Sequence, residues 1–297
     1  MSVHSDWGDW LLRAIESADP EGLALWYLGC NGFVIKSAGG TVVFVDPYLG
    51  TGDPPRTVRM LPVPFDPVDV AEADAVLATH EHSDHVHGPS QAPVLAETGA
   101  VFYAPEASMG VVEAADWRGR WGLSDDQFRT VCEDDSFVVG DLTVTVGPAN
   151  DPDAKQPVSY VVEHESGTFV HVGDARPGGF GDLAAHDIDV GALAFGTTGM
   201  LPDKETREPV ETTWYNTEAM LVEAARELEL DRLVPTHWDM WRGVTPDPPA
   251  PHHPPPRVCF PPPAAPLLAR GPGGARPGRP NPRRPGHKAR PRRPAVG

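Results

Sequence analysis

The sequence predicts an α+β fold in which two mixed β-sheets pack face to face and helices cover the outside. Three observations lead to this prediction. Short apolar runs bounded by turn residues recur through the first 247 residues. Several of these runs are joined by glycine-containing turns, as strands are in hairpins. Stretches with helical spacing fall between groups of strands rather than after every strand.

The first half of this region contains two predicted helices. Residues 6–17 have apolar side chains at helical spacing after a Ser5 or Asp6 cap, and a second helix is expected at 107–115. Residues 50–64 are rich in Gly, Pro and Thr and predict a loop. The strands predicted for this half lie at residues 23–27, 32–36, 41–45, 75–79 and 101–104.

The second half repeats the strand-turn-strand pattern. Gly140-Asp141 and Glu165-Ser166-Gly167 each stand between two apolar runs and predict hairpins. Residues 216–228, with a Thr213 or Asn216 start, have one apolar face and predict a helix. The strands predicted for this half lie at residues 136–139, 142–146, 158–163, 168–172, 190–195 and 232–235.

Charge is divided unevenly along the chain. The formal net charge is −18, yet residues 248–297 hold ten Arg and Lys and no Asp or Glu, which leaves 14 basic against 42 acidic residues in 1–247. So acidic a domain is not expected to bind nucleic acid, because neutralising phosphates requires a basic surface. We therefore predict one folded domain over 1–247 and a separate tail.

Proline makes up 17 of the residues from 248 to 297. Such a stretch cannot bury enough apolar surface to offset its ordering entropy, so the tail is expected to be disordered or polyproline II. The abrupt change of composition also suggests a frame-shifted or otherwise non-native segment. The alternatives are a basic arm that tethers nucleic acid or a membrane surface, and a passive linker.

The cysteines and the N-terminus bear on the compartment. Cys30, Cys132 and Cys259 form no CxxC pair, and their odd number gives no disulfide framework. This usage favours a reducing, cytoplasmic location. The first residues lack the basic and apolar regions of a signal peptide, and no apolar run approaches the length of a membrane span.

The strongest signal is the run HEHSDH, directly after the predicted strand 75–79. Imidazole nitrogens and carboxylate oxygens are the ligands of Zn²⁺, and Mn²⁺ or Fe accept similar sets. Alternate side chains of a strand share a face, so His80 and His82 are expected to bind one ion. A turn after His82 would direct Asp84 and His85 to a second ion. The spacing thus predicts half of a two-metal hydrolytic site rather than a polar loop.

Two later residues are candidates for the other half. Asp174 follows the predicted strand 168–172, where its carboxylate could bridge two ions; otherwise it is a turn residue before a Gly-rich loop. His237 follows the strand 232–235 and would complete the second position; a lone histidine is otherwise usually hydrogen-bonded in a core. The strand-end placement of both residues favours the ligand interpretation.

These motifs resemble those of the metallo-β-lactamase superfamily, whose hallmark is HxHxDH after a strand. Within it the chain is similar to the L-ascorbate-6-phosphate lactonase family, and the likeness covers roughly residues 23–246. Four stretches carry it: residues 74–85, 149–151, 171–174 and 234–241. The resemblance implies the αββα sandwich of that superfamily.

The resemblance also implies the remaining ligand. Many members have a histidine after the strand that corresponds to 142–146, and this chain has none. In the lactonase branch an aspartate takes that place, which favours Asp151 over Asn150 or water, although Asn-Asp-Pro is also a turn sequence. Asp46 matches an early superfamily aspartate and is expected to hold the ligand loop by hydrogen bonds. Cys30 is expected to be a small buried thiol.

The implied activity is hydrolysis of a lactone or ester by a hydroxide between two divalent ions, Zn²⁺ or Mn²⁺. Asp84 would orient the hydroxide and pass a proton to the leaving group, and Asp174 would bridge the ions. The chain departs from the lactonase family at Pro152, where the family has Arg, and in the loop 175–179. The phosphosugar substrate therefore stays open, and Arg176 could meet an anionic substrate.

Three other functions are alternatives. A phosphodiesterase would use the same fold, but the acidic domain argues against a nuclease. A flavin-linked oxygen reductase would need a second, flavodoxin-like domain, for which the chain has no room. A degenerate member would keep the fold without activity. We expect a small-molecule substrate and no membrane partner, and the sequence leaves the oligomeric state open.

Overall fold

The computed structural model describes residues 3–53, 57–203 and 205–241, together with the short strands at 257–258 and 267–268. It contains two seven-stranded sheets. The first has the order β16 (Leu267–Leu268), β1 (Ala24–Gly29), β2 (Gly32–Lys36), β3 (Val42–Val45), β4 (Ala75–Leu77), β5 (Val101–Ala104), β6 (Phe128–Thr130). The second has the order β15 (Arg257–Val258), β14 (Arg232–Thr236), β11 (Val190–Ala194), β10 (Gly167–His171), β9 (Val158–His164), β8 (Leu142–Pro148), β7 (Ser136–Val139).

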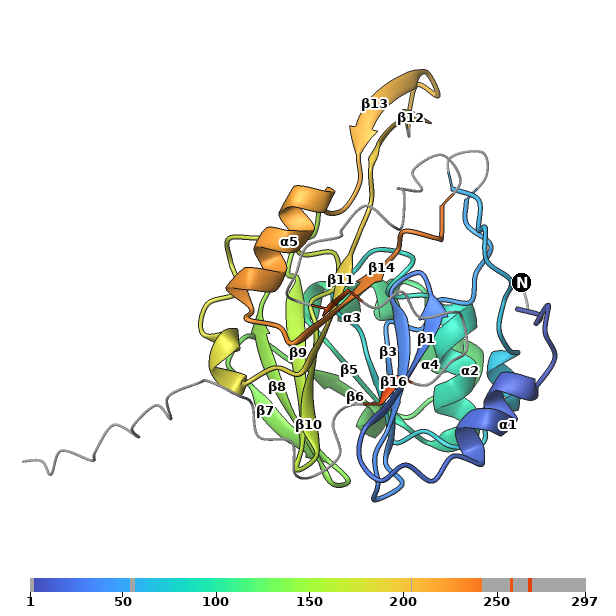
Figure 1. Cartoon of the computed structure of the whole chain (residues 1–297). Helices are drawn as coiled ribbons and strands as arrows, with labels where there is room; N and C mark the ends of the chain where they lie inside the picture. The colour runs from blue at the N-terminus through green and yellow to red at the C-terminus, as the bar shows by residue number, and fades with distance from the viewer. Residues whose placement is uncertain (1–2, 54–56, 204, 242–256, 259–266, 269–297) are drawn as a thin grey trace, which may run out of the picture.

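A separate hairpin of β12 (Thr198–Pro202) and β13 (Pro209–Thr213) projects from the body of the molecule (Figure 1). The described helices are α1 (Trp10–Glu16), α2 (Gly88–Thr98), α3 (Glu106–Ala114), α4 (Trp117–Trp121) and α5 (Glu218–Glu227). Three single turns of 3₁₀ helix accompany them: η1 (Pro67–Asp69), η2 (Asp125–Gln127) and η3 (Leu183–His186). Among the described residues, none of these helices is long and apolar enough to cross a bilayer.

The two sheets pack against each other through one shared apolar core. Phe33 of β2 lies at its centre, with its ring centroid 5.3 Å from that of Phe169 on β10. Alternation along the strands sends every second side chain into this core, as with Leu25 and Tyr27 of β1. The intervening Trp26 faces the opposite side of the sheet.

Helices cover both outer faces. Side chains of α1, α2, α3 and α4 pack on the first sheet in a second core, which contains Trp26 and Phe44. Side chains of α5 and η3 pack on the second sheet in a third core, which contains Val170 and Leu233. The layers are thus helix, sheet, sheet and helix, which confirms the predicted αββα sandwich (Figure 1).

The predicted elements are present with shifted ends. The first helix begins at Trp10 rather than near Asp6, because Asp6 pairs with Val63: its backbone N–H donates to the Val63 carbonyl and its carboxylate accepts from the Val63 N–H. The last helix begins at Glu218, because the buried Asn216 amide donates instead to backbone carbonyls of neighbouring segments.

Several elements lacked a sequence prediction. Helix α2 begins at Gly88-Pro89 and contains Pro93, residues that are typical of loops; proline in the first turn is nevertheless compatible with a helix. Short α4 and β6, and the polar β12–β13 hairpin, were likewise not predicted.

The predicted tail, 248–297, lies outside the described residues except for two short strands. The backbone of β15 pairs in parallel with β14, and that of β16 pairs antiparallel with β1.

Strand direction brings the candidate ligands to one edge of the sandwich. In the first sheet β3 and β4 run parallel, and in the second β10, β11 and β14 run parallel. Asp46, His80, Asp174 and His237 all follow the carboxyl ends of these strands. Residues distant in sequence therefore meet where the two sheets face each other.

Candidate metal centre

The loop after β4 carries the histidine motif. The strand ends at Leu77, so the prediction that it extends to Thr79 and presents His80 and His82 from alternate strand positions is wrong. Thr79 instead donates from its backbone N–H and its hydroxyl to the Asp46 carboxylate, at 2.8 and 2.7 Å, which takes the place of strand pairing. A turn then closes through the bond from the His85 N–H to the His82 carbonyl, 2.9 Å.

A first cluster joins His80, His82, Asp151 and Asp174, whose ligand atoms all lie within 4.8 Å of one another. His80 Nε2 is 2.9 Å from His82 Nδ1 and 3.7 Å from Asp151 Oδ2. It is also 4.0 Å from Asp174 Oδ2. The structure thus brings two imidazoles from one loop together with two carboxylates, the second of which lies almost a hundred positions later in the sequence.

Asp151 carries an orphaned oxygen in this cluster. Its Oδ1 accepts a hydrogen bond from the Asp153 N–H at 3.0 Å, whereas the buried Oδ2 has no hydrogen-bond partner among the described residues. Burial, and then the neighbouring charge of Asp174, raise the pKa of Asp151 to about 6. The Asn150 amide is engaged elsewhere, donating to the Pro177 carbonyl at 2.8 Å. A carboxylate oxygen held in this way fits a bound cation.

A second cluster joins His85, Asp174 and His237. Asp174 Oδ1 lies 3.5 Å from His85 Nε2 and 3.2 Å from His237 Nε2, and the two imidazole nitrogens are 3.4 Å apart. Asp84 Oδ2 lies 3.8 Å from His237 Nε2. Asp174 therefore belongs to both clusters, with one carboxylate oxygen toward each.

Asp174 is held in its ionised form. Burial alone would raise its pKa, but the charges of His237 and His85 outweigh burial and hold that pKa well below its usual range. The side-chain amide of Asn31 also donates to Oδ1 at 3.1 Å. Asn31 was not predicted as part of the site. Its position beside Cys30, in the turn between β1 and β2, was the feature of the sequence that could have indicated it.

Asp46 lies behind the second cluster and is fully buried. Its Oδ2 is 2.7 Å from His85 Nδ1, so that nitrogen donates to Asp46 and the ring directs Nε2 toward Asp174. Burial would raise the Asp46 pKa, but His85 and His171 outweigh it and lower the value. His171, whose Nδ1 lies 3.8 Å from the same oxygen, is a buried neighbour that was not predicted.

His237 is fixed through its backbone N–H and through one face of its ring. Its backbone adopts φ 62°, and its N–H donates to the Cys30 carbonyl at 2.7 Å. The ring of Tyr215 stacks on the imidazole with centroids 4.1 Å apart. The Tyr27 hydroxyl accepts a hydrogen bond from the His237 backbone N–H at 3.2 Å. Neither tyrosine was predicted as part of the site.

Two further predicted residues lie close by. Cys30 is completely buried and free, and its Sγ lies 3.5 Å from His237 Nδ1. Arg176 lies near Asp151, where its Nη2 is 3.2 Å from the Asp153 carboxylate. The Nε of Arg176 is buried and has no hydrogen-bond partner among the described residues.

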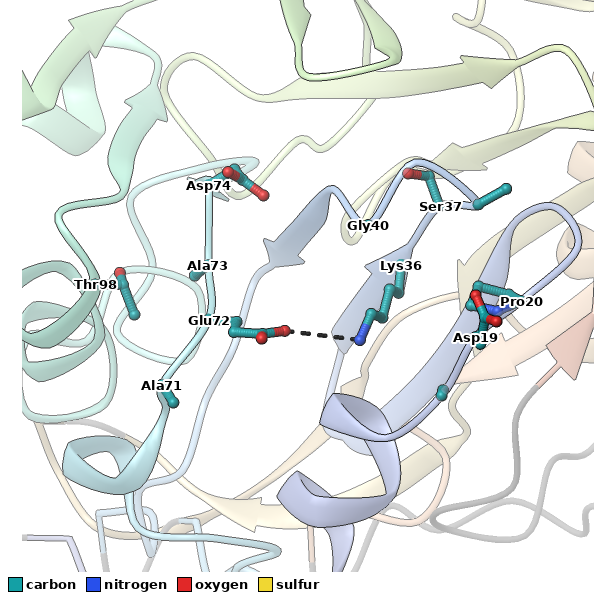
Figure 2. Close-up of a pocket in the computed structure, with 12 residues that line it drawn as sticks. Asp19, Pro20, Lys36, Ser37, Gly40, Ala71, Glu72, Ala73, Asp74 and Thr98 are labelled. Carbon is teal, nitrogen blue, oxygen red and sulfur yellow. Dashed lines mark ion pairs between the residues drawn. The ribbon is translucent and has the colours of Figure 1, made fainter.

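A cavity of about 440 Å³ lies apart from the metal clusters and contains none of their residues (Figure 2). Its amine, Lys36 Nζ, donates to the carbonyls of Ile15 and Glu16 at the end of α1 and lies 3.6 Å from the Glu72 carboxylate. Lys36 thereby neutralises the carbonyl end of that helix, which is a structural role.

Comparison with known proteins places these observations in a family. The model of a beta-lactamase superfamily domain matches residues 41–238, more than half of the chain. The probable L-ascorbate-6-phosphate lactonase UlaG of Escherichia fergusonii is 27% identical over 295 residues, covering 84% of this chain and 79% of that protein. These matches confirm the resemblance inferred from the sequence.

Solved structures share the fold at low identity. An isothiocyanate hydrolase from Delia radicum gut bacteria is 18% identical, with a TM-score of 0.60 over 83% of this chain and 99% of that one. The metallo hydrolase Igni18 from Ignicoccus hospitalis is 17% identical, with a TM-score of 0.56 over 82% of this chain and 97% of that one.

Proposed function

Because the chain belongs to the beta-lactamase superfamily, whose fold and paired ligand clusters are those of a metal-dependent hydrolase, we propose that it hydrolyses a lactone or ester at a two-metal centre. The observation that supports this proposal most directly is the position of the Asp174 carboxylate between the two clusters. One carboxylate directs Oδ2 toward His80 and Oδ1 toward His85 and His237. A shared carboxylate between two imidazole-rich clusters is the arrangement a two-metal site requires.

The described residues divide into two ligand sets. His80, His82 and Asp151 would hold the first ion, and the second would be held by Asp84, His85 and His237, with Asp174 between them. Nitrogen and oxygen donors of this kind accept Zn²⁺ or Mn²⁺. When bound, the two ions supply hydroxide at neutral pH, by lowering the pKa of water from 15.7 to about 7, and polarise the scissile carbonyl.

The chain's own residues would position the reactants and move the proton. Asp84 is the most exposed of the second set, at 18% of its side chain against 0% for His85 and His237. It can therefore accept a proton at its carboxylate and pass it to the leaving oxygen of the substrate. Asp46 holds His85 in the required tautomer through Nδ1.

A neutral ester or lactone is favoured over a phosphodiester. The guanidinium of Arg176 contacts the largely exposed Asp153 carboxylate, and its buried Nε has no hydrogen-bond partner among the described residues, so Arg176 does not distinguish the two substrates. The surroundings of the second cluster are apolar and aromatic, with Tyr48, Leu201 and Trp241 packed together. The relatedness to a probable lactonase supports the same class of substrate.

The test combines metal analysis with a substrate screen. We expect two metal equivalents per chain, turnover of a panel of lactones and aryl esters, and little turnover of bis-p-nitrophenyl phosphate. His80→Ala and His82→Ala should lose the first metal equivalent and the activity. Protein that binds no metal, or either variant with full metal content and turnover, would overturn the proposal. Turnover of the phosphodiester alone would replace the ester assignment.

A further inference from the structure

Cys30 occupies an unusual position for its residue type. It lies in the tight turn between β1 and β2 with φ 57°, in the left-handed region that favours glycine or asparagine. Non-glycine residues in this conformation concentrate at functional sites, where the surrounding structure holds them. Here the Cys30 carbonyl accepts hydrogen bonds from the Tyr27 hydroxyl and the His237 N–H, at 2.8 and 2.7 Å, which fix the turn.

This turn directs the thiol toward the second ligand cluster. Cys30 Sγ lies 3.5 Å from His237 Nδ1, 3.7 Å from His237 Nε2 and 3.8 Å from Asp84 Oδ2. Ligand atoms bonded to one zinc ion at about 2.0–2.3 Å lie roughly 3–4 Å apart. The separations around Cys30 lie in that range, and Cys30, Asp84 and His237 form a Cys-Asp-His group able to hold an ion.

The same thiol also touches an apolar cluster. Tyr48, Leu201 and Met240 pack with Cys30, which is how a buried cysteine behaves as a small hydrophobic residue. That role alone does not require a strained turn or the approach to a carboxylate and an imidazole that both belong to the metal centre. Cys132, which is exposed and lies 3.3 Å from Asp135, has neither feature.

We propose that Cys30 is a ligand of the second metal position, together with Asp84 and His237, and that it makes this position selective for a thiophilic ion such as Zn²⁺. The inference rests on the proposed two-metal centre. On binding, the thiol releases its proton to solvent and a sulfur–metal bond forms, with no change of oxidation state. The hard ion Mn²⁺ gains less from sulfur, so thiolate ligation favours Zn²⁺ over Mn²⁺.

Cobalt substitution tests this directly in the full-length chain. Co²⁺ bound to a thiolate absorbs in the near ultraviolet through sulfur-to-metal charge transfer, and imidazole and carboxylate ligands alone give no such band. We expect the band in the native protein and in Cys132→Ser, which retains Cys30. It should disappear in Cys30→Ser and Cys30→Ala. A Zn²⁺ titration should show the second equivalent weakened at least about tenfold in both Cys30 variants, with a smaller change for Mn²⁺.

The outcomes separate this inference from the proposed function. Two bound cobalt ions and normal ester hydrolysis without a charge-transfer band in the native protein would overturn the role of Cys30 and leave the hydrolase intact. A band that depends on Cys30 in a protein inactive on every ester would support the ligand and refute the activity. Failure to bind Co²⁺ or Zn²⁺ would overturn both. The measurement on native protein stands even if a Cys30 variant folds poorly, which circular dichroism would reveal.

Discussion

Replacing Asp46 by asparagine should weaken both the fold and the second metal position. Asp46 Oδ2 accepts hydrogen bonds from the Thr79 hydroxyl and from His85 Nδ1, each at 2.7 Å, and Oδ1 accepts from the Thr79 N–H at 2.8 Å. An amide keeps the shape but places an NH₂ group, which cannot accept, where one oxygen stands. Either orientation of the amide therefore loses acceptor capacity.

The magnitude follows from these bonds. A hydrogen bond to a charged group contributes about 1.5–3 kcal/mol. An amide that turns its NH₂ toward the Thr79 N–H loses one such bond and one that turns it toward His85 loses two, so the free energy of unfolding should fall by about 1.5–6 kcal/mol. Breaking a buried ion pair costs about 3–5 kcal/mol, which agrees. With its NH₂ toward His85, the amide would also donate to Nδ1 and so place the proton on Nε2, the atom that faces Asp174. We expect the second Zn²⁺ equivalent to bind about 10–100-fold more weakly.

Two assays check this prediction. Denaturant unfolding of chelator-treated protein measures the stability term, and zinc titration with a competing chelator measures the affinity term. Asp69→Asn, at an exposed position in η1, is the matched control and should change stability by no more than about 0.5 kcal/mol. If Asp46→Asn behaved like this control in both assays, the assignment of Asp46 as the residue that orients His85 would be refuted.

Two further predictions concern carboxylates whose pKa values shift in opposite directions. Asp151 has its pKa raised to about 6, so its ionised form destabilises the metal-free protein once the pH rises above about 4. At pH 7.5 the chelator-treated Asp151→Asn variant should therefore be about 1–3 kcal/mol more stable than the native protein. This difference in unfolding free energy should shrink by pH 4.5. Its metal content should fall at the same time, and equal unfolding free energies at pH 7.5 would contradict the first expectation. Asp141 accepts from the Ser37 and Thr41 hydroxyls, each at 2.6 Å; burial would raise its pKa, but these bonds outweigh it and lower the value. Its contribution is therefore present above the unfolded pKa and lost as the pH falls through the folded pKa. Because Asp141 is exposed and solvent screens its interactions, Asp141→Ala should cost only about 0.5–1 kcal/mol at pH 7 and progressively less below pH 4 in urea unfolding, with Asp69→Ala as control. A cost that did not diminish in acid would contradict it.

The sequence predicted the fold and the site to different depths. The layers were predictable because apolar alternation marks strands that are buried on one or both faces, and because glycine turns mark hairpins. The position of Asp174 and His237 beside the histidine motif was predictable because each lies just beyond the carboxyl end of a strand. Helix α2 was not, because Gly88-Pro89 and Pro93 are local signals for a loop, and packing on the first sheet overrides them.

The surroundings of the ligands were harder to predict. Asn31, His171 and Tyr215 approach the clusters from three separate segments, and their spacing in the sequence does not indicate which ligand each of them contacts. Their roles depend on which strands become neighbours, which is a property of the assembled sandwich. Asp46 was predicted as a supporting residue, but its effect on the tautomer of His85 needed the distance to Nδ1.

Asp174 has one consequence for any measurement of metal binding. Because its two oxygens face different clusters, two bound ions would share this ligand, and the affinity of each position would then depend on whether the other is filled. Such coupling is reciprocal: each ion changes the binding affinity of the other by the same factor. Titration curves for this protein should therefore be fitted with two stepwise dissociation constants and a coupling factor between them. Two independent dissociation constants would not describe the binding at either position.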